Sequence, residues 1–359
     1  MIEVKTEVLQ NMVNKAIRGA SCNQLIPLTS YIGITFVPNT LSLLTTDGMN
    51  YLNVSCDLEG GEELRAVVLA DTFAKLVRRL GGATVKLSLT DKCLLVECHG
   101  TYKLELLVDD EGNPVEFKMP FDNFADKPKL GEFSRSLITR MMVSLKQSLA
   151  TVPTRPHYCC YRMGDEAIAT NTSLISILNQ KVFETPKLVS AECMNLLDAV
   201  VDEGKSAVPY QLDGAVVYDC GNAVLYSREP NGIENFNSAS IKGFADGEFP
   251  YHCTISVDAL IETLERIDIF VSEYEKLRPA DLEFTQDGVT VTSRNTGGVE
   301  LVQYETLEGE PQFTCTVDVK SMLLVLQAQS SAVVDLYFGT EQTIKIVDGD
   351  LVTILALMN

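Results

Sequence analysis

The fold is determined by the stretch Ile34-Thr-Phe-Val-Pro-Asn-Thr-Leu-Ser-Leu-Leu-Thr-Thr-Asp47-Gly-Met-Asn-Tyr-Leu-Asn-Val54, whose pattern occurs three times in the chain. It predicts a strand, a tight turn, a second strand, a small polar loop and a third strand. The pattern returns in Cys159-Cys-Tyr-Arg-Met-Gly-Asp-Glu-Ala-Ile-Ala-Thr-Asn171-Thr-Ser-Leu-Ile-Ser-Ile177 and in Leu282-Glu-Phe-Thr-Gln-Asp-Gly-Val-Thr-Val-Thr-Ser-Arg-Asn295-Thr-Gly-Gly-Val-Glu-Leu-Val302. Asp47, Asn171 and Asn295 follow one another at an equal interval of 124 residues, which indicates an internal repeat.

A second set of strands keeps nearly the same period, so each repeat contains two half-units. These strand pairs are Val85–Leu89 with Tyr102–Leu106, Val208–Leu212 with Ala223–Tyr226, and Val334–Phe338 with Val352–Leu355. Apolar residues at helical spacing precede every half-unit, and we expect six helices and about two dozen short strands. The apolar positions are Leu9, Met12, Val13, Ala16 and Ile17; Phe73, Leu76, Val77 and Leu80; Leu137, Met141, Leu145 and Leu149; Met194, Leu197 and Val201; Leu260, Leu264 and Ile267; and Met322, Val325 and Leu326.

The chain has 359 residues, which is long for one core, and its 46% hydrophobic and 22% charged residues are typical of a folded protein. The repeat predicts three α+β domains, at residues 1–124, 125–246 and 247–359. The boundaries should lie near Phe121–Lys129, which carries two prolines, and near Gly243–Pro250, which carries two glycines.

Other features of the sequence exclude several classes of protein. The charged start Met1–Glu7 lacks the basic region and apolar run of a secretory signal, and no apolar stretch approaches the ~20 residues that span a bilayer. We therefore expect a cytoplasmic location. The ten cysteines and three histidines show no zinc-ligand spacing, so we expect buried free thiols and neither a metal nor a cofactor.

The net charge of −20 argues against nucleic-acid binding unless positive charge is concentrated locally. The predicted helices of the first two domains do concentrate it, on faces opposite their apolar stripes. These cations are Lys15 and Arg18 on the first helix; Lys75, Arg78 and Arg79 within Ala70–Leu80; and Arg135, Arg140 and Lys146 within Ser134–Ala150. The helices near Ser190–Asp202 and Val257–Val271 are net acidic, so a DNA-binding surface would be uneven. An ordinary solvated face is the alternative for any single basic helix.

Several short motifs, taken in order and spacing, resemble those of the bacterial DNA polymerase III beta subunit, or beta sliding clamp. The motifs are Leu25-Ile-Pro27-Leu28, Leu43-Leu-Thr-Thr-Asp47, Ala169-Thr170-Asn171, Gly247-Glu-Phe-Pro250 and the terminal Val352-Thr-Ile-Leu-Ala-Leu-Met-Asn359. The resemblance covers nearly the whole chain and is that of a diverged member.

The resemblance implies three tandem clamp domains, each with two helices and about eight strands. Two subunits would join head to tail in a ring, and duplex DNA would pass through it without sequence preference. The chain would then be a non-catalytic processivity subunit of a DNA polymerase. The DNA-facing residues that the resemblance and the basic helices indicate together are Lys15, Arg18, Asn23, Arg78, Arg79, Arg135, Arg140, Lys146 and Arg155.

The resemblance also implies two protein interfaces. Ring closure would pair the first domain of one subunit with the third domain of the other, through Leu76, Leu104 and Leu106 on one side and Ile269, Phe270 and Glu300 on the other. These residues could instead fill their own domain cores. An apolar pocket would take short peptides from the DNA polymerase, the clamp loader and other partners. Its matching positions are Thr170, Asn171, Thr172, Leu174, Ile175, Pro250, Ile255, Ile354, Leu355, Ala356, Leu357 and Met358.

The pocket sequence departs from the family pattern. The family usually has Asp-Gly-His-Arg-Leu after the threonine and Met-Pro-Met-Arg-Leu at the end, where this chain has Asn171–Ile175 and Leu355–Asn359. Losing two arginines and a histidine removes charge and hydrogen-bond donors while apolar character remains. We therefore expect an altered peptide preference, as in a clamp of a mobile element or a divergent lineage.

Two other functions remain open. An enzyme would need convergent catalytic groups, and the neighbours Cys98-His99 and His252-Cys253 are poor dyads because adjacent strand residues point to opposite faces. A clamp-fold adaptor or decoy could bind replication proteins without encircling DNA. The acidic third domain and the altered pocket favour that alternative.

Overall fold

The computed structural model describes residues 1–152, 154–270, 277–294 and 297–358. Three residues named above, Val271, Asn295 and Asn359, lie outside the described residues. The chain forms two units. Unit 1 comprises Met1–Ile138 and Glu192–Glu229, and unit 2 comprises Thr139–Ala191 and Pro230–Asn359.

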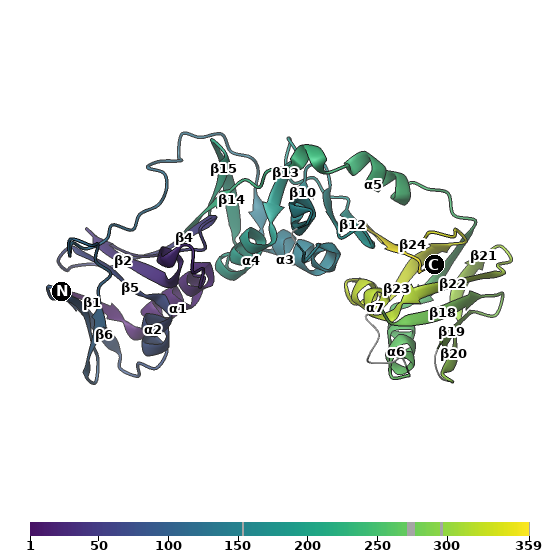
Figure 1. Ribbon diagram of the computed structural model, residues 1–359, viewed down its shortest axis with the longest axis horizontal. Helices are drawn as coiled ribbons and strands as arrows, with labels where there is room; N and C mark the ends of the chain where they lie inside the picture. The colour runs from purple at the N-terminus through teal and green to yellow at the C-terminus, as the bar shows by residue number, and fades with distance from the viewer. Residues whose placement is uncertain (153, 271–276, 295–296, 359) are drawn as a thin grey trace. The chain divides into compact units, whose positions relative to one another are not determined.

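Unit 1 contains an eight-stranded sheet, in the order β5-β2-β3-β4-β16-β15-β14-β9, and a four-stranded sheet, in the order β1-β6-β7-β8 (Figure 1). Its strands are β1 (Ile2–Lys5), β2 (Tyr31–Val37), β3 (Thr40–Thr46), β4 (Asn50–Asp57), β5 (Leu64–Leu69), β6 (Thr84–Leu89), β7 (Cys93–Glu97), β8 (Thr101–Glu105), β9 (Phe133–Ser134), β14 (Ser206–Leu212), β15 (Ala215–Asp219) and β16 (Ala223–Arg228). Helices α1 (Thr6–Ala16) and α2 (Ala70–Val77) belong to this unit, as does α4 (Ala191–Val200) from its second residue onward.

Unit 2 contains a nine-stranded sheet, in the order β13-β10-β11-β12-β25-β24-β23-β17-β21, and a four-stranded sheet, in the order β20-β19-β18-β22. Its strands are β10 (Cys160–Met163), β11 (Ala167–Thr170), β12 (Leu174–Leu178), β13 (Lys187–Ser190), β17 (Tyr251–Ser256), β18 (Pro279–Phe284), β19 (Val289–Ser293), β20 (Val299–Val302), β21 (Tyr304–Glu308), β22 (Phe313–Asp318), β23 (Val333–Phe338), β24 (Thr343–Asp348) and β25 (Leu351–Ala356). Its helices are α5 (Ser238–Ala245), α6 (Val257–Asp268) and α7 (Val319–Gln327), and α3 (Arg135–Leu145) continues into it from unit 1.

The two long sheets are built in the same way, because each joins two half-units along one antiparallel strand pair. In unit 1 the pair is β4 with β16, where Tyr51 lies opposite Tyr226. In unit 2 it is β12 with β25, where Ile175 lies opposite Ile354. Since Ile175 follows Tyr51 by the repeat interval of 124 residues, the two junctions are in equivalent register.

This pairing explains why the middle third of the chain is shared between the units. Its first half-unit, β10 to β12, belongs to the long sheet of unit 2, and its second half-unit, β14 to β16, belongs to that of unit 1. Backbone hydrogen bonds across the junctions therefore group the half-units differently from their order along the chain. The division into three domains at residues 1–124, 125–246 and 247–359 stays a prediction.

The residues that mark the repeat close the turn between the second and third strands of a half-unit. The carboxylate of Asp47 accepts hydrogen bonds from the backbone of Met49 and Asn50. The side chain of Asn171 accepts the same two bonds, from Ser173 and Leu174. The repeat marker therefore reflects turn chemistry, in which a short polar side chain replaces a backbone partner.

The turn also requires a left-handed residue one position after the marker. In the first copy this is Gly48, with φ of 98°, and in the second it is Thr172, with φ of 79°. Glycine adopts this conformation freely, whereas a β-branched residue is strained in it. Thr172 is therefore a strained position.

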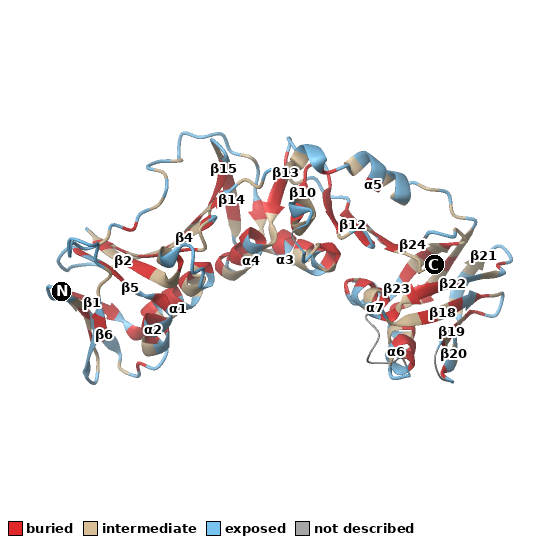
Figure 2. Cartoon of the chain, in the orientation of Figure 1, coloured by how far each residue is buried: buried red, intermediate tan, exposed pale blue. Residues whose placement is uncertain are grey.

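The predicted apolar stripes form the core, and the buried faces of the helices meet the sheets (Figure 2). Of the predicted stripe residues, Ile17 and Leu76 are only partly buried. The six expected helices are present, and α5 is a seventh in the described part of the chain that the periodicity did not predict. Side-chain caps begin α5, α6 and α7, where Asn237, Ser256 and Asp318 accept a backbone hydrogen bond three residues on.

The cysteines are free thiols, but the expectation that they are buried holds for only some of them. Five are buried and Cys22 is exposed.

None of the helices within the described residues has the length and apolar character needed to cross a membrane.

Two leucines on α7 test the core. Leu326 is 1% exposed and Leu324 is 40% exposed, so Leu326→Ala leaves a cavity and Leu324→Ala does not. We expect the first change to lower the free energy of unfolding by about 2–5 kcal/mol and the second by less than about 1 kcal/mol, measured by urea denaturation. Equal losses would contradict this placement of α7.

Candidate functional site: helix cations and an apolar pocket

The basic ends of α1 and α2 lie side by side in unit 1 (Figure 1). Gln10 of α1 donates hydrogen bonds to the carbonyls of Val77 and Leu80 at the end of α2, and Arg78 donates to the side chain of Asn14 at 2.8 Å. The two bonds from Gln10 reach carbonyls at and just after the C-terminal end of α2, where the helical hydrogen-bond pattern stops. They also hold the two helix ends, and the arginines that follow them, close together.

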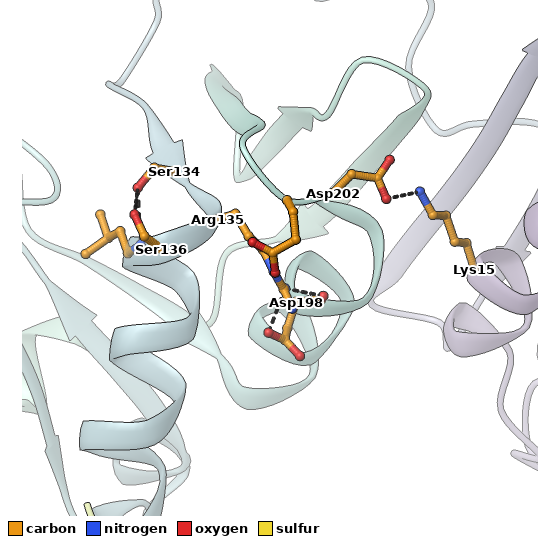
Figure 3. A network of polar contacts seen from close by, with 8 residues as sticks. Lys15, Ser134, Arg135, Ser136, Asp198 and Asp202 are labelled. Atoms are coloured by element: carbon orange, nitrogen blue, oxygen red, sulfur yellow. Dashed lines mark hydrogen bonds and ion pairs between the residues drawn. The ribbon is translucent and has the colours of Figure 1, made fainter. Parts of the chain in front are cut away.

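Two of the predicted DNA-facing cations form ion pairs with acidic residues in and after α4 (Figure 3). Lys15 is largely buried, and its Nζ lies 2.7 Å from Oδ1 of Asp202. Arg135 contacts both the carbonyl and the carboxylate of Asp198, the latter at 2.7 Å, and lies 3.6 Å from Glu203. The acidic character of the α4 region, noted in the sequence, thus neutralises cations of α1 and α3.

A third predicted cation, Arg140 of α3, is bound within unit 2. Its guanidinium donates to Oδ1 of Asp350 at 2.6 Å and to the hydroxyl of Ser330 at 2.9 Å. Ser330 is itself bound by Asp348, which accepts from the backbone and hydroxyl groups of Ser330 and Ser331. Burial opposes ionisation of Asp348, but these bonds together lower its pKa. Arg140 is therefore fixed in a network of charged and hydroxyl groups.

The remaining predicted DNA-facing residues are exposed and have no carboxylate partner among the described residues. Arg78 is bound only to Asn14, Arg155 lies over the ring of Tyr158 at 5.8 Å, and the side chain of Asn23 accepts a bond from its own loop. Arg18, Arg79 and Lys146 have no such contact within the described residues. The nine predicted residues thus divide into carboxylate-bound cations and residues open to solvent.

A narrow apolar pocket of about 190 Å³ lies in unit 2 between α5 and the junction of β12 and β25. Four of the predicted residues line it: Thr172, Ile175, Ile354 and Ala356. Four further residues that the sequence did not indicate complete it: Ser173, Phe244, Gln342 and Thr343. The pocket is therefore apolar at its centre and uncharged at its rim.

The other predicted pocket residues lie elsewhere. Leu174, Ile255 and Leu355 point to the opposite face of the sheet and pack in the core with α6 and α7. Thr170 is buried and bonds the carbonyl of Leu174, and Asn171 closes its turn. Pro250, Leu357 and Met358 are at least partly exposed but are not among the lining residues. Alternation along β12 and β25 explains the division, because neighbouring strand residues face opposite sides.

Helix α5 forms the wall of the pocket, and two lysines anchor its last turn. Lys242 lies 2.8 Å from Glu166, a nearly buried carboxylate that also pairs with Arg162 at 3.1 Å. In the same last turn, the ammonium of Lys345 donates to the carbonyl of Ala245 at 3.1 Å. Such a cation at a helix C-terminus satisfies an unpaired carbonyl and complements the helix dipole.

The equivalent position in unit 1 is filled by the chain itself. There Tyr226 corresponds to Ile354, and Phe121 stacks on it with ring centroids 6.0 Å apart. Phe124 contacts both Phe121 and Tyr210, at 5.7 and 5.1 Å. An extended segment with two aromatic side chains therefore covers the first junction, whereas the second junction is open.

The predicted dimer-interface residues lie at or near two sheet edges. Leu104 is on β8, the edge strand of one small sheet, and is buried in its own unit, while Leu106 follows this strand and Leu76 on α2 is partly buried. In unit 2, Ile269 is 77% exposed, and Glu300 on the edge strand β20 pairs with Arg266 at 2.8 Å.

Further apolar side chains are exposed around the same two edges. Phe270 is exposed beside Gly298, near the start of β20. The sequence did not indicate Tyr102 on β8 or Val299 and Leu301 on β20, which are also exposed. Both edge strands therefore carry apolar surface that a partner strand could cover.

Of the two sequence-neighbour pairs of cysteine and histidine, His252-Cys253 forms no catalytic dyad. Cys253 is in the core, where burial raises the pKa of its thiol to about 12, and His252 lies on the other face of β17, bound to Asp335. The expectation that Cys98 and His99 are strand residues is wrong, because they lie in the turn after β7. A protonated buried thiol is a poor nucleophile.

Long antiparallel sheets joined from repeated half-units, with helices packed against them, define the α+β clamp class of fold. Solved bacterial beta sliding clamps match the chain over its full length. The DNA polymerase sliding clamp of Bacillus subtilis matches at 15% identity and a TM-score of 0.87, covering 100% of this chain and 98% of that chain. The beta sliding clamp of C. crescentus matches at 16% identity and a TM-score of 0.85, covering 100% of this chain and 98% of that chain. The DNA polymerase III subunit beta of Pseudomonas aeruginosa matches at 14% identity and a TM-score of 0.86, covering 100% of this chain and 99% of that chain.

The chain therefore has the fold of the bacterial DNA polymerase III beta sliding clamps, as the motifs predicted, with the low identity of a diverged sequence. No protein-family model matches it, and no curated protein matches it in sequence.

The strained residue in the pocket gives a test of its geometry. Thr172→Gly should raise the free energy of unfolding by about 1 kcal/mol, because glycine relieves the left-handed strain. The matched change Thr290→Gly, in β19, should lower it by about 1 kcal/mol, because glycine weakens a strand. Urea denaturation measures both, and a loss of stability in Thr172→Gly would contradict the strain.

Proposed function

We propose that the protein is a DNA sliding clamp, a non-catalytic processivity subunit that encircles duplex DNA and tethers a DNA polymerase. The observation that carries this proposal is the full-length match to solved sliding clamps, with solvent-exposed cations at the ends of helices. A cytoplasmic location and a homodimeric ring form part of the proposal.

Contact with DNA would rest on the cations that have no carboxylate partner. Arg18, Arg79 and Lys146 can approach phosphates without first giving up an ion pair. Lys15, Arg135 and Arg140 cannot, because each is bound to an aspartate. Long-range attraction to phosphates, without hydrogen bonds to base edges, suits a protein that slides. The acidic remainder of the surface would disfavour DNA elsewhere.

Partner proteins would dock in the pocket beside α5. Its floor of Ile175 and Ile354 and its wall of Phe244 provide an apolar site with polar, uncharged edges, which suits short peptide segments. The filled junction in unit 1 supports this, because there a segment of chain lies over the equivalent residue. The expected partners are a DNA polymerase, a clamp loader and other proteins that carry clamp-binding peptides.

Ring closure would pair β8 of one subunit with β20 of the other. Both are edge strands with unpaired backbone groups, and exposed apolar side chains lie on or beside them. Such edges associate readily unless they are covered. A closed head-to-tail ring covers both edges of each subunit.

An adaptor that binds replication proteins without encircling DNA is the second candidate. The pairing of Lys15, Arg135 and Arg140 with aspartates favours it, because this pairing reduces the positive charge available for DNA. The two candidates differ in whether the protein is linked topologically to DNA.

Two triple variants test which cations meet DNA. Replacing Arg18, Arg79 and Lys146 by alanine should weaken binding to a labelled duplex and flatten the plot of log affinity against log salt. The slope should fall by about 0.9 for each phosphate that the variant no longer neutralises. Fluorescence anisotropy over a salt series measures this slope.

The matched variant replaces Lys15, Arg135 and Arg140 by alanine, which removes the same charge. Because these cations are bound to carboxylates, their removal should change the slope much less. Equal changes in slope from the two triple variants would show that the ion pairs do not decide DNA contact.

A topological experiment separates a clamp from an adaptor. Protein mounted on a nicked circular plasmid should remain bound during gel filtration and should dissociate after one restriction cut, since a ring slides off a free end. In the same chromatography, the free protein should elute at about twice the subunit mass of 39.5 kDa.

An edge-strand variant provides the control for ring closure. Leu301→Lys places a charge on the exposed face of β20 and should yield monomers that are not retained. Leu25→Lys, at a highly exposed loop position, should behave like the unchanged protein. If the unchanged protein is retained equally on circular and on cut DNA, encirclement is ruled out.

A further inference from the structure

The pocket beside α5 continues into a second hollow of unit 2. This hollow, of about 350 Å³, shares Phe244, Gln342 and Thr343 with the pocket. Its other lining residues come from the end of α5, the segment after it and the turn before β24: Gly243, Gly247, Glu248, Phe249, Thr340 and Glu341. The pocket and the hollow therefore form one groove, which we call the α5 groove.

The α5 groove is uncharged at one end and acidic at the other. All residues that line the pocket are uncharged. The hollow presents Glu248 and Glu341, which are exposed and have no ion-pair partner within the described part of the chain. Asp246, also exposed, lies between Glu248 and α5 in the sequence.

The cations nearest to the groove are bound by the protein itself. Lys345 lies over the rings of Tyr337 and Phe249, at 4.5 and 4.9 Å, and donates to the end of α5. Burial lowers the pKa of Lys345, so its charge is partly withdrawn from solvent. Lys242 is paired with Glu166. A ligand in the groove would therefore meet free carboxylates but only engaged ammonium groups.

We propose that the α5 groove binds a short extended peptide that combines an apolar or aromatic anchor with an adjacent basic residue. The anchor enters the pocket beside Phe244, and the basic side chain meets Glu248 and Glu341. This inference rests on the proposed function of the pocket and names the chemical class of its ligand. A peptide with acidic residues at the same position is disfavoured by repulsion, which gives the groove specificity.

The occupied junction in unit 1 supports a peptide as the ligand. Phe121 and Phe124 lie only three residues apart in one segment, and their rings cover Tyr226 and Tyr210. In unit 2 the equivalent row is Ile354, Lys345 and Tyr337, because the strand registers of the two sheets correspond. Phe249 already lies near Tyr337, at 6.4 Å, so the position over Ile354 is the part left for an external side chain.

Two labelled decapeptides test the proposal with the full-length protein. Both carry the same Leu-Phe pair, flanked by two lysines in one peptide and by two glutamates in the other. Fluorescence anisotropy at low salt should show about fivefold tighter binding of the basic peptide, as expected for two exposed ion pairs. The difference should shrink as salt is raised, because exposed charges are screened.

Variants test whether the preference for the basic peptide arises from the α5 groove. The double change Glu248→Gln and Glu341→Gln should remove most of the difference between the peptides. The matched change Glu265→Gln and Glu310→Gln, at exposed carboxylates outside the groove lining, should leave the difference intact. Phe244→Ala should weaken both peptides, because they share the apolar anchor.

The outcomes separate the inference from the proposed function. Equal or tighter binding of the acidic peptide would overturn the basic preference and leave the peptide pocket in place. Binding of neither peptide would overturn both proposals for the pocket. Unchanged binding in Phe244→Ala would place the peptides outside the α5 groove and overturn the inference.

Discussion

Antiparallel pairing between half-units is the constraint on which the rest of the structure depends. A half-unit alone would expose a strand edge, and the pairs β4 with β16 and β12 with β25 satisfy the backbone groups of those edges. The same pairs also create the floor of the apolar pocket. Ile175 and Ile354, far apart in the sequence, form one apolar floor only because their strands pair.

The two junctions have equivalent strand pairing but differ in what covers them. Both present a row of side chains on the face away from the paired core helices. In unit 1 the row contains two tyrosines, Tyr226 and Tyr210, which are covered by Phe121 and Phe124. In unit 2 Ile354 replaces the tyrosine, and a helix, α5, stands beside it with Phe244 facing the open pocket. Repetition of the fold thus gives two equivalent junctions, and local substitution decides whether the chain covers the junction or leaves a pocket there.

Ion pairs within the protein decide which lysines and arginines of a basic helix are available to contact phosphates. The face of α3 has no acidic residue of its own, yet Arg135 and Arg140 are both bound to aspartates from other elements. Burial of Lys15 beside Asp202 has the same effect on α1. An ion pair that must be broken opposes phosphate contact, so the exposed cations without carboxylate partners carry the proposed attraction for DNA. At the acidic end of the α5 groove the situation is reversed, because Glu248 and Glu341 are exposed carboxylates without an ion-pair partner among the described residues.

The sequence by itself determined the strands and the six amphipathic helices, because each depends on periodicity within a few residues, and it showed the repeat through the equal interval of 124 residues. It also located the turn at Asn171, since a short polar side chain closes that turn locally. Other features are decided only by the tertiary structure. The pairs Lys15 with Asp202 and Arg140 with Asp350 join residues 187 and 210 positions apart, which no local pattern reveals.

For the same reason, the structure brings together only some of the residues expected at the pocket. The resemblance indicated residues on both pocket strands, but alternation sends Leu174 and Leu355 to the core and leaves Ile175 and Ile354 in the pocket. The wall residue Phe244 was missed because its helix contains Gly243, whose low helix propensity favoured a domain boundary. Packing on the sheet and the anchors Lys242 and Lys345 stabilise that helix, and those contacts exist only once the distant strands have come together.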